Sequence, residues 1–251
     1  MLVIVSDFGV EGPYLGQVRA VLHQHAPGVP VIDLFNDLPA FDIRSAAYLL
    51  PAYTRDFPAD TVFVCVVDPG VGGTRRPAIV RADGHWFVGP DNGLFHVLGQ
   101  RAGRLEWWDI TWRPATLSAS FHGRDLFAPV AAGLARGNLP AADKVEPAWQ
   151  RLRDWPDEYW AVSYIDRYGN AMTGVRAMSV DCRDELIVSG RVLRHARTFG
   201  EVLEGEAFWY ENANGLVEIA VNRGSAARIL KLAPGAEIMK RAHGSSRGNA
   251  C

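Results

Sequence analysis

The sequence predicts an α/β N-terminal domain with a mostly parallel sheet, followed by a small all-β, barrel-like C-terminal domain. In the first half of the 251 residues, apolar strand-like runs alternate with stretches of helical spacing. This is the pattern of βαβ units, whose helices cover both faces of a sheet. Beyond residue 158 the apolar runs are short and alternating, and Gly and Asn separate them. That second pattern is typical of antiparallel barrels and sandwiches.

The elements of the first half follow from the spacing of apolar residues. Runs of mostly apolar residues predict strands at residues 2–6, 29–35 and 61–67. Apolar residues at helical spacing predict helices at residues 14–25, 43–53, 94–98 and 123–135. Pro51 is expected to interrupt the second of these helices. Asp83-Gly84 predicts a hairpin turn between residues 78–81 and 86–88.

The domain boundaries follow from changes in composition. We expect the α/β domain to span residues 1–140 and the barrel domain to span residues 159–242, with one short helix at 225–230. Residues 141–158 are rich in Pro, Ala and charged side chains and are expected to form a linker. Residues 243–251 are polar and are expected to form a flexible tail.

Charge and composition argue against several classes of protein. The formal net charge is −2 and no basic stripe is present, which argues against a nucleic-acid partner. No apolar run approaches the length of a membrane span and no targeting signal is recognisable, so we expect a cytoplasmic protein without a membrane partner. The cysteines form no CxxC pair, so no metal site is expected.

The most informative segment runs from Asp68 to Arg76. A β-branched run ends at Asp68, and a Gly-rich loop follows that contains Arg75. In open α/β sheets, ligands bind beyond the carboxyl ends of parallel strands. Glycine lets the backbone come close to a ligand, while the carboxylate and guanidinium supply opposite charges there. A surface turn with a solvated ion pair explains this segment alone equally well.

Other polar residues follow predicted strands or precede predicted helices. Asp7 ends the first strand, at the same sheet edge as Asp68, where its carboxylate suits the two hydroxyls of a ribose. Asn92 follows a strand and a Gly-Pro turn, and His122 precedes a helix. Asn170 closes a turn and has an amide suited to a purine edge. A helix cap, an exposed loop or an ordinary turn remains an alternative for each residue.

Several common catalytic motifs do not occur in the sequence. The loop after Asp68 lacks the Lys-Ser/Thr ending of a phosphate-binding loop. The HExxH motif of zinc proteases does not occur. No GxGxxG-like loop follows the first strand, which disfavours a methyltransferase.

Six motifs, in order, carry a family resemblance. SDFG, VVDPGVGGTRR, VGPDNGL, SFHGRDLFAP, IDRYGN and LVEIAVNRGSA run through nearly the whole chain. Together they resemble the S-adenosyl-L-methionine (SAM) hydrolase family, adenosine-forming, also called SAM hydroxide adenosyltransferases and related to fluorinases and chlorinases. The resemblance implies a homotrimer whose active sites lie between the first domain of one subunit and the second domain of its neighbour.

The resemblance also implies roles for individual residues. It assigns a hydrolytic triad to Asp68, Arg75 and His122. It assigns substrate binding to Asp7, Phe8, Asn92, Asp166, Asn170 and Asn212, with the ribose hydroxyls on Asp7 and the methionine and adenine ends near Asp166 and Asn170. SAM is the implied substrate, and no cofactor or metal is implied.

The implied reaction is the attack of water at the ribose C5′ of SAM, which releases L-methionine and leaves adenosine. The leaving thioether departs neutral, so the limiting difficulty is the weak nucleophilicity of water. A carboxylate or imidazole can take the proton of water, and a guanidinium favours hydroxide character. Two alternatives remain open: a halide-dependent 5′-halo-adenosine synthase, and a non-catalytic binder of adenosine or SAM. Gly12 and Ala213 depart from the family pattern near the methionine end and leave the second alternative open.

Overall fold

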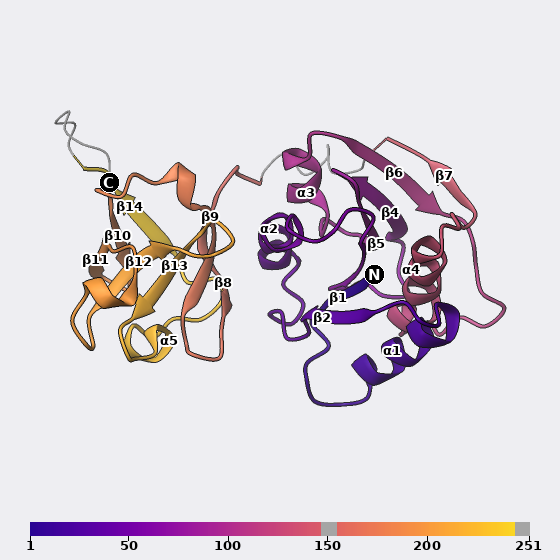
Figure 1. Ribbon diagram of the computed structural model, residues 1–251, viewed down its shortest axis with the longest axis horizontal. Helices are drawn as coiled ribbons and strands as arrows, with labels where there is room; N and C mark the ends of the chain where they lie inside the picture. Colours follow the sequence, from indigo (N-terminus) through magenta and orange to yellow (C-terminus); the bar gives the residue numbers. More distant parts are fainter. Residues whose placement is uncertain (147–154, 244–251) are drawn as a thin grey trace. The chain divides into compact units, whose positions relative to one another are not determined.

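A computed structural model describes residues 1–146 and 155–243. The chain forms two compact units, Met1–Asp154 and Trp155–Cys251 (Figure 1). Each unit contains its own seven-stranded sheet. The expected fold class, an α/β unit followed by a barrel-like all-β unit, is confirmed.

The sheet of the first unit has a parallel half and an antiparallel half. Its strands are β1 (Leu2–Ser6), β2 (Val31–Phe35), β3 (Val62–Val66), β4 (Arg76–Ala82), β5 (His85–Asp91), β6 (Leu105–Ile110) and β7 (Ala142–Lys144), in the order β2-β1-β3-β5-β4-β6-β7. The pairs among β2, β1, β3 and β5 are parallel, and those from β5 to β7 are antiparallel. The sheet is therefore less parallel than expected, because β4 turns back into β5 at Asp83-Gly84.

Helices cover both faces of this sheet. They are α1 (Tyr14–His25), α2 (Ile43–Thr54), α3 (His96–Arg101) and α4 (Ala128–Ala135). Figure 1 shows α1 and α4 on one face and α2 and α3 on the other. The side chain of Asp42 caps α2 by accepting the N–H of Ser45 at 2.9 Å. Contrary to expectation, α2 continues through Pro51.

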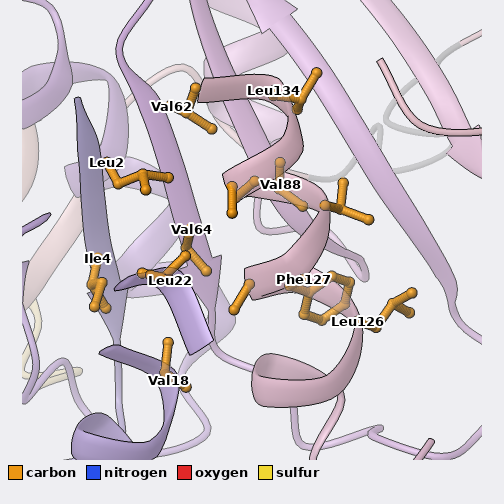
Figure 2. Close-up of a cluster of buried hydrophobic side chains, with 14 of the residues drawn as sticks. Leu2, Ile4, Val18, Leu22, Val62, Val64, Val88, Leu126, Phe127 and Leu134 are labelled. Carbon is orange, nitrogen blue, oxygen red and sulfur yellow. The ribbon is translucent and has the colours of Figure 1, made fainter. Parts of the chain in front are cut away.

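Successive side chains of β3 point to opposite faces of this sheet and contribute to the hydrophobic core on each face. Val62 and Val64 point toward α1 and α4 and pack with residues such as Leu22 and Phe127 (Figure 2). Phe63, between them, lies on the opposite face and stacks on Phe87 with ring centroids 4.9 Å apart. Because each fully buried side chain of this size contributes about 1.5–3 kcal/mol, β3 is fixed from both sides. The loop that follows β3 therefore starts from a rigid strand end.

The expected helix at residues 123–135 begins with a π-helix, η1 (Gly123–Phe127), and continues as α4. The N–H of Ala128 reaches back to the carbonyl of Gly123. Pro129 has no N–H to continue the ordinary helical ladder at this point, which is compatible with the wider turn. His122 lies at the N-terminus of this π-helix.

The segment expected to be a linker, residues 141–158, contains strand β7, which pairs with β6. Residues 147–154 of that segment and residues 244–251 of the expected tail lie outside the described residues. Within the described part of the chain, no helix is long and apolar enough to cross a membrane.

The second unit is a curved antiparallel sheet. Its strands are β8 (Tyr159–Ile165), β9 (Ala171–Arg176), β10 (Glu185–Val188), β11 (Arg191–His195), β12 (Ala207–Glu211), β13 (Leu216–Val221) and β14 (Ile238–Arg241), in the order β14-β10-β11-β12-β13-β9-β8. Only β11 and β12 are paired in parallel. A bridge between Ala161 and Glu237 links the two edges, so the sheet nearly closes. Its short helices are Ala177–Ser179, Phe199–Glu201 and α5 (Ala226–Ile229).

Candidate active site

The candidate site forms where the loop after β3 meets the loop before η1. Gly72 makes this meeting possible, because its φ is +77° and a Cβ there would lie 2.4 Å from the carbonyl oxygen of Ala119. Any side chain at this position would push the two loops apart. Sequence reasoning expected these glycines to admit a ligand. The structure shows instead that Gly72 admits the loop that carries His122.

The three residues of the predicted triad lie together. Arg75 Nε donates to both carboxylate oxygens of Asp68, at 2.9 and 3.0 Å, and Arg75 Nη2 also contacts Asp68. The same Nη2 lies 2.8 Å from Nδ1 of His122. The side chains of Arg75 and Asp68 are only 9% and 5% exposed. This is a buried, bridged cluster, and the alternative of a solvated surface ion pair does not describe it.

The guanidinium of Arg75 is held from a further direction. Its Cζ lies 5.3 Å from the centre of the ring of Phe127, the last residue of η1, which is buried in the core (Figure 2). Cation–π contact and two hydrogen-bonding partners together fix the plane of the guanidinium. Arg75 therefore occupies one orientation between Asp68 and His122.

The environment of His122 determines its charge and which ring nitrogen carries the proton. Burial, and then the positive charge of Arg75, lower the pKa of His122 below its usual range. The ring is therefore neutral at pH 7 and carries one proton. A guanidinium can only donate, so Nδ1 must accept and the proton of the ring resides on Nε2. His122 in this state is a hydrogen-bond donor through Nε2.

A cavity of about 350 Å³ adjoins this cluster. Asp68 and His122 line it together with Asp7 and Phe8, all four of them predicted from the sequence. The remaining lining residues are Tyr14, Ala40, Phe41, Val66, Val71, Ser120, Phe121 and Gly123. Two carboxylates and one imidazole therefore face the same small, otherwise largely apolar space, which is the usual composition of a small-molecule site.

Asp7 follows β1, as expected, and lies at the edge of the sheet shared with Asp68. Its Oδ2 accepts the backbone N–H of Phe41 at 2.9 Å. Burial raises the pKa of Asp7, although that hydrogen bond acts in the opposite direction. Among the described residues of the site, Asp7 has no cationic partner. Its carboxylate can therefore still accept hydrogen bonds from hydroxyl groups in the cavity.

Aromatic rings form one wall of the cavity. Phe121 meets Phe8 and Tyr14 edge-on, with ring centroids 5.8 and 5.4 Å away. Gly123 allows this packing, because a Cβ there would lie 2.9 Å from the ring of Phe8. The sequence pattern did not single out Tyr14 or Phe121 as site residues, since aromatic residues near a strand or helix end more often fill a core.

Phe41 was also missed by sequence reasoning. It lines the cavity, its side chain remains 72% exposed, and its φ is +65°. A positive φ is unusual for a bulky residue and recurs at functional sites. No residue signal in a single sequence announces this conformation, because the preceding Leu-Pro-Ala is compatible with many turns.

Asn92 has a different environment from the other predicted site residues. Its Nδ2 donates to the carbonyl of Val67 at 2.9 Å, and its Oδ1 accepts the N–H of Leu94 at 3.2 Å. Both ends of the amide thus bind backbone, and Asn92 is not among the residues that line the cavity. It holds the end of β3 directly before Asp68.

The second unit has its own cavity, of about 660 Å³, which two of its three predicted site residues line. Asp166 and Asn170 line this cavity. Asp166 accepts the backbone N–H of Asn170 at 2.8 Å and its side-chain amide at 3.2 Å. Tyr168, Phe199, Tyr210, Glu218, Arg223, Ser225 and Arg228 are also among the lining residues.

Asn212 lies next to this cavity but is occupied by protein contacts. Its Oδ1 accepts the N–H groups of Asn214 and Leu216, both at 3.0 Å. Its Nδ2 donates to Glu218 at 2.9 Å. Glu218 also accepts the hydroxyl proton of Tyr210 at 2.5 Å, and burial raises its pKa. Asn212 therefore shapes the turn between β12 and β13.

Comparison with known proteins adds independent information. Two family models match the chain: the SAM hydroxide adenosyltransferase N-terminal domain over residues 2–144 and the C-terminal domain over residues 160–239. A protein named (R)-S-adenosyl-L-methionine hydrolase from Thermus thermophilus is 42% identical, over 93% of this chain and 96% of its own. A second of that name, from Salinispora arenicola, is 38% identical over 93% and 94%.

A more distant relative and two solved structures are also similar to this chain. A fluorinase from an Actinoplanes species is 23% identical over 55% of this chain and 55% of its own. The crystal structure of an uncharacterized conserved protein from Thermotoga maritima has a TM-score of 0.84 and 31% identity, covering 96% of this chain and all of that one. That of a conserved hypothetical protein from Thermus thermophilus has a TM-score of 0.74 and 37% identity over 96% and 99%. The chain belongs to the SAM hydroxide adenosyltransferase family.

Proposed function

We propose that this protein hydrolyses S-adenosyl-L-methionine to adenosine and L-methionine. The observation that carries the proposal is the buried Asp68–Arg75–His122 cluster, which opens on a cavity that also contains the carboxylate of Asp7. Full-length relatives at 42% and 38% identity are named (R)-S-adenosyl-L-methionine hydrolase. Both domains of the family are present in this chain.

The cluster can bind and activate one water molecule. The carboxylate of Asp68 keeps acceptor capacity beyond its hydrogen bonds from Nε and Nη2 of Arg75, so it can accept a proton from water. Arg75 places a positive charge behind the developing hydroxide. Attack of the water oxygen at C5′ forms a C–O bond and breaks the C–S bond, and the electron pair of that bond neutralises the sulfonium.

The tautomer of His122 assigns it a role different from that of Asp68. Because Nδ1 accepts from Arg75, His122 offers only the Nε2 proton. It can donate to the oxygen of the nucleophilic water, which orients the other lone pair toward carbon. We therefore assign proton acceptance to Asp68 and orientation of the water to His122.

The same geometry disfavours the halide-dependent alternative. A halide ion accepts hydrogen bonds and gains nothing from a neighbouring carboxylate, whereas water needs one acceptor and one donor. Asp68 lines the cavity, and its negative charge would repel an anion at the proposed position of the nucleophile. The similarity to a fluorinase, at 23% identity, therefore reflects common ancestry and does not imply a halide nucleophile.

We further propose that the substrate binds between two subunits of a homotrimer. Asp7 holds the ribose hydroxyls, with Phe8 beside it, in the cavity of the first unit. Asp166 and Asn170 of a neighbouring subunit hold the methionine and adenine ends, and Asn212 shapes the adjoining turn. Asn92 supports the strand end that carries Asp68. Exposed apolar side chains at the rim of the first cavity, Tyr14 and Phe41, are compatible with a covering partner.

We also propose that the protein prefers one configuration of the sulfonium centre of SAM. The names of the two full-length relatives specify the (R) sulfur centre. In-line attack requires sulfur to lie opposite the water, so inversion at sulfur redirects the methionine chain and changes its contacts. We expect the (R) diastereomer to have the higher kcat/KM of the two.

The test is a chromatographic assay of purified protein with each diastereomer, with and without chloride or fluoride. We expect adenosine and L-methionine in equal amounts, no halo-adenosine, and a loss on the order of 10²–10⁴-fold in kcat for His122→Ala and Arg75→Ala. Undiminished turnover in both variants would remove the triad assignment. Calorimetric binding of SAM without any product would support the non-catalytic alternative.

A further inference from the structure

The loop at residues 118–125 carries His122 and also a charged pair that the proposed chemistry does not use. This pair is Arg124 and Asp125, in the SFHGRD motif. The His122 contact with Arg75 is one hydrogen bond of 2.8 Å between side chains from different loops. Such a bond weakens steeply when donor and acceptor shift. Something must therefore hold the loop at residues 118–125 in place.

Asp125 closes this loop on itself. Its Oδ2 accepts the backbone N–H of Ser118 at 2.9 Å, which joins the two ends of the loop. Its own backbone N–H donates to the carbonyl of Phe121 at 3.2 Å. Its side chain is 15% exposed and its pKa is lowered, chiefly by the hydrogen bond with Arg124. The loop that contains His122 is thus tied across its base by one carboxylate.

Arg124 attaches the closed loop to the rest of the unit. Its Nε donates to Asp125 Oδ1 at 2.6 Å and its Nη2 to Oδ2 at 3.0 Å, a two-point contact. Its Nη1 donates to Oε1 of Gln17 on α1 at 2.9 Å. Its Cζ also lies 5.0 Å from the centre of the Phe121 ring, which forms part of the cavity wall.

We propose that Arg124 and Asp125 are positioning residues of this active site, which hold His122 at hydrogen-bonding distance from Arg75. The inference rests on the proposed function for its kinetic consequence. Neither side chain lines the cavity of the first unit. Their effect is therefore on the placement of His122 and Phe121, and a misplacement of about 1 Å can reduce turnover on the order of 10²-fold.

The test uses the full chain with substitutions at both positions. We expect Arg124→Ala to lower kcat about 10- to 100-fold while KM changes less than kcat does. Arg124→Lys keeps the charge but lacks the planar fork, so we expect a loss close to that of alanine. Asp125→Asn retains one acceptor for Ser118 and is expected to lose less.

A matched control is available on the surface of the same unit. Arg19 of α1 pairs with Asp33, in an exposed contact between an arginine and an aspartate. We expect Arg19→Ala to keep wild-type kcat. If Arg124→Ala fails to fold, Asp125→Asn provides the measurement. Wild-type kcat in folded Arg124→Ala and Asp125→Asn would overturn the proposal.

A second readout is independent of turnover. Nitrogen-15 NMR of labelled histidine reports which ring nitrogen is protonated, and the His122 signal is assigned by its absence in His122→Gln. We expect protonation on Nε2 in the wild type and a mixture of tautomers in Arg124→Ala. An unchanged tautomer in that variant contradicts the positioning role. Absence of adenosine formation by the wild type contradicts the proposed function and leaves this readout intact.

Discussion

In the proposed mechanism, Arg75 is the residue that decides the chemistry, because it acts on two partners at once. It donates to the carboxylate of Asp68 and to Nδ1 of His122. An arginine cannot accept a hydrogen bond, so its presence fixes the direction of every hydrogen bond in the cluster. Asp68 is left as the acceptor for the proton of water, and His122 is left as a donor. The two neighbours of Arg75 should therefore respond differently to substitution.

We predict that Asp68→Asn loses at least tenfold more kcat than His122→Gln. Asparagine removes the proton acceptor, a loss on the order of 10³-fold, whereas glutamine retains an N–H donor close to the place of Nε2. Steady-state assays with saturating SAM compare the two variants, and circular dichroism verifies their fold. Equal losses, or a larger loss in His122→Gln, would assign proton acceptance to His122 instead.

The raised pKa of Asp7 affects the stability of the folded protein. Burial raises its pKa above the ordinary value of 3.8, so the folded protein binds this proton more tightly than the unfolded chain does. Stability from this residue is present at low pH and falls as pH rises through the raised pKa, because the unfolded state then binds fewer protons. At pH 7 the ionised carboxylate lowers the free energy of unfolding.

We therefore predict that Asp7→Asn melts at a higher temperature than the wild type at pH 7 and has a higher KM for SAM. The gain in melting temperature should disappear as the pH falls below the raised pKa of Asp7, because its carboxyl group is then protonated. Asp56, whose side chain is 73% exposed, serves as the control through Asp56→Asn. A gain that persists unchanged at low pH would show that ionisation of Asp7 is not its cause.

At the scale of elements, the site depends on two loops that approach each other through Gly72. We predict that Gly72→Ala is destabilising by more than the left-handed conformation alone would cost, which is about 1–2 kcal/mol. The additional cost comes from the contact of the new Cβ with the carbonyl of Ala119, 2.4 Å away. Turnover should fall as well, because the displaced loop carries His122.

Gly137 is the matched control for this substitution. Its φ is +81°, close to that of Gly72, but among the described residues no atom beyond its chain neighbours lies within 4 Å of the place of its Cβ. Gly137→Ala therefore measures the backbone cost without the contact. Chemical unfolding of both variants gives the difference. Equal destabilisation, with wild-type turnover in Gly72→Ala, would show that the close approach of the two loops is unimportant.

The elements of the first unit could largely be predicted because apolar periodicity records which face is buried. β3, with Val62 and Val64 on one face and Phe63 on the other, is an example. The passage of α2 through Pro51 and the π-helix at Gly123–Phe127 could not be predicted, because tertiary packing overrides local preference there. The same limit applies to Phe41, whose backbone conformation is set by the loop around it.

The sequence could predict those residues of the candidate site that lie at the ends of strands. Asp7 and Asp68 follow β1 and β3, which are paired in parallel, and both line the expected cavity. The contacts of Asn92 and Asn212 with backbone groups could not be predicted, since an amide near a turn has the same sequence signal whether it binds a ligand or the chain. The arrangement of Arg124 and Asp125 likewise depends on the folded loop.

At the scale of the whole molecule, the proposed homotrimer has a measurable consequence. We predict that light scattering coupled to size-exclusion chromatography gives three times the mass of one chain. We also expect specific activity to fall when dilution produces monomers, because the cavities of the first and second units would then no longer serve one substrate. A monomer with full specific activity would contradict an active site shared between subunits.

The central claim is that water, activated by the Asp68–Arg75–His122 cluster, attacks C5′ of SAM. Its most direct test is turnover of SAM in water enriched with oxygen-18, followed by mass spectrometry of the adenosine. We expect the label to enter the 5′-hydroxyl group of the adenosine, and we expect Asp68→Asn to form almost no labelled adenosine. Adenosine without the label, or undiminished labelling by Asp68→Asn, would contradict the central claim.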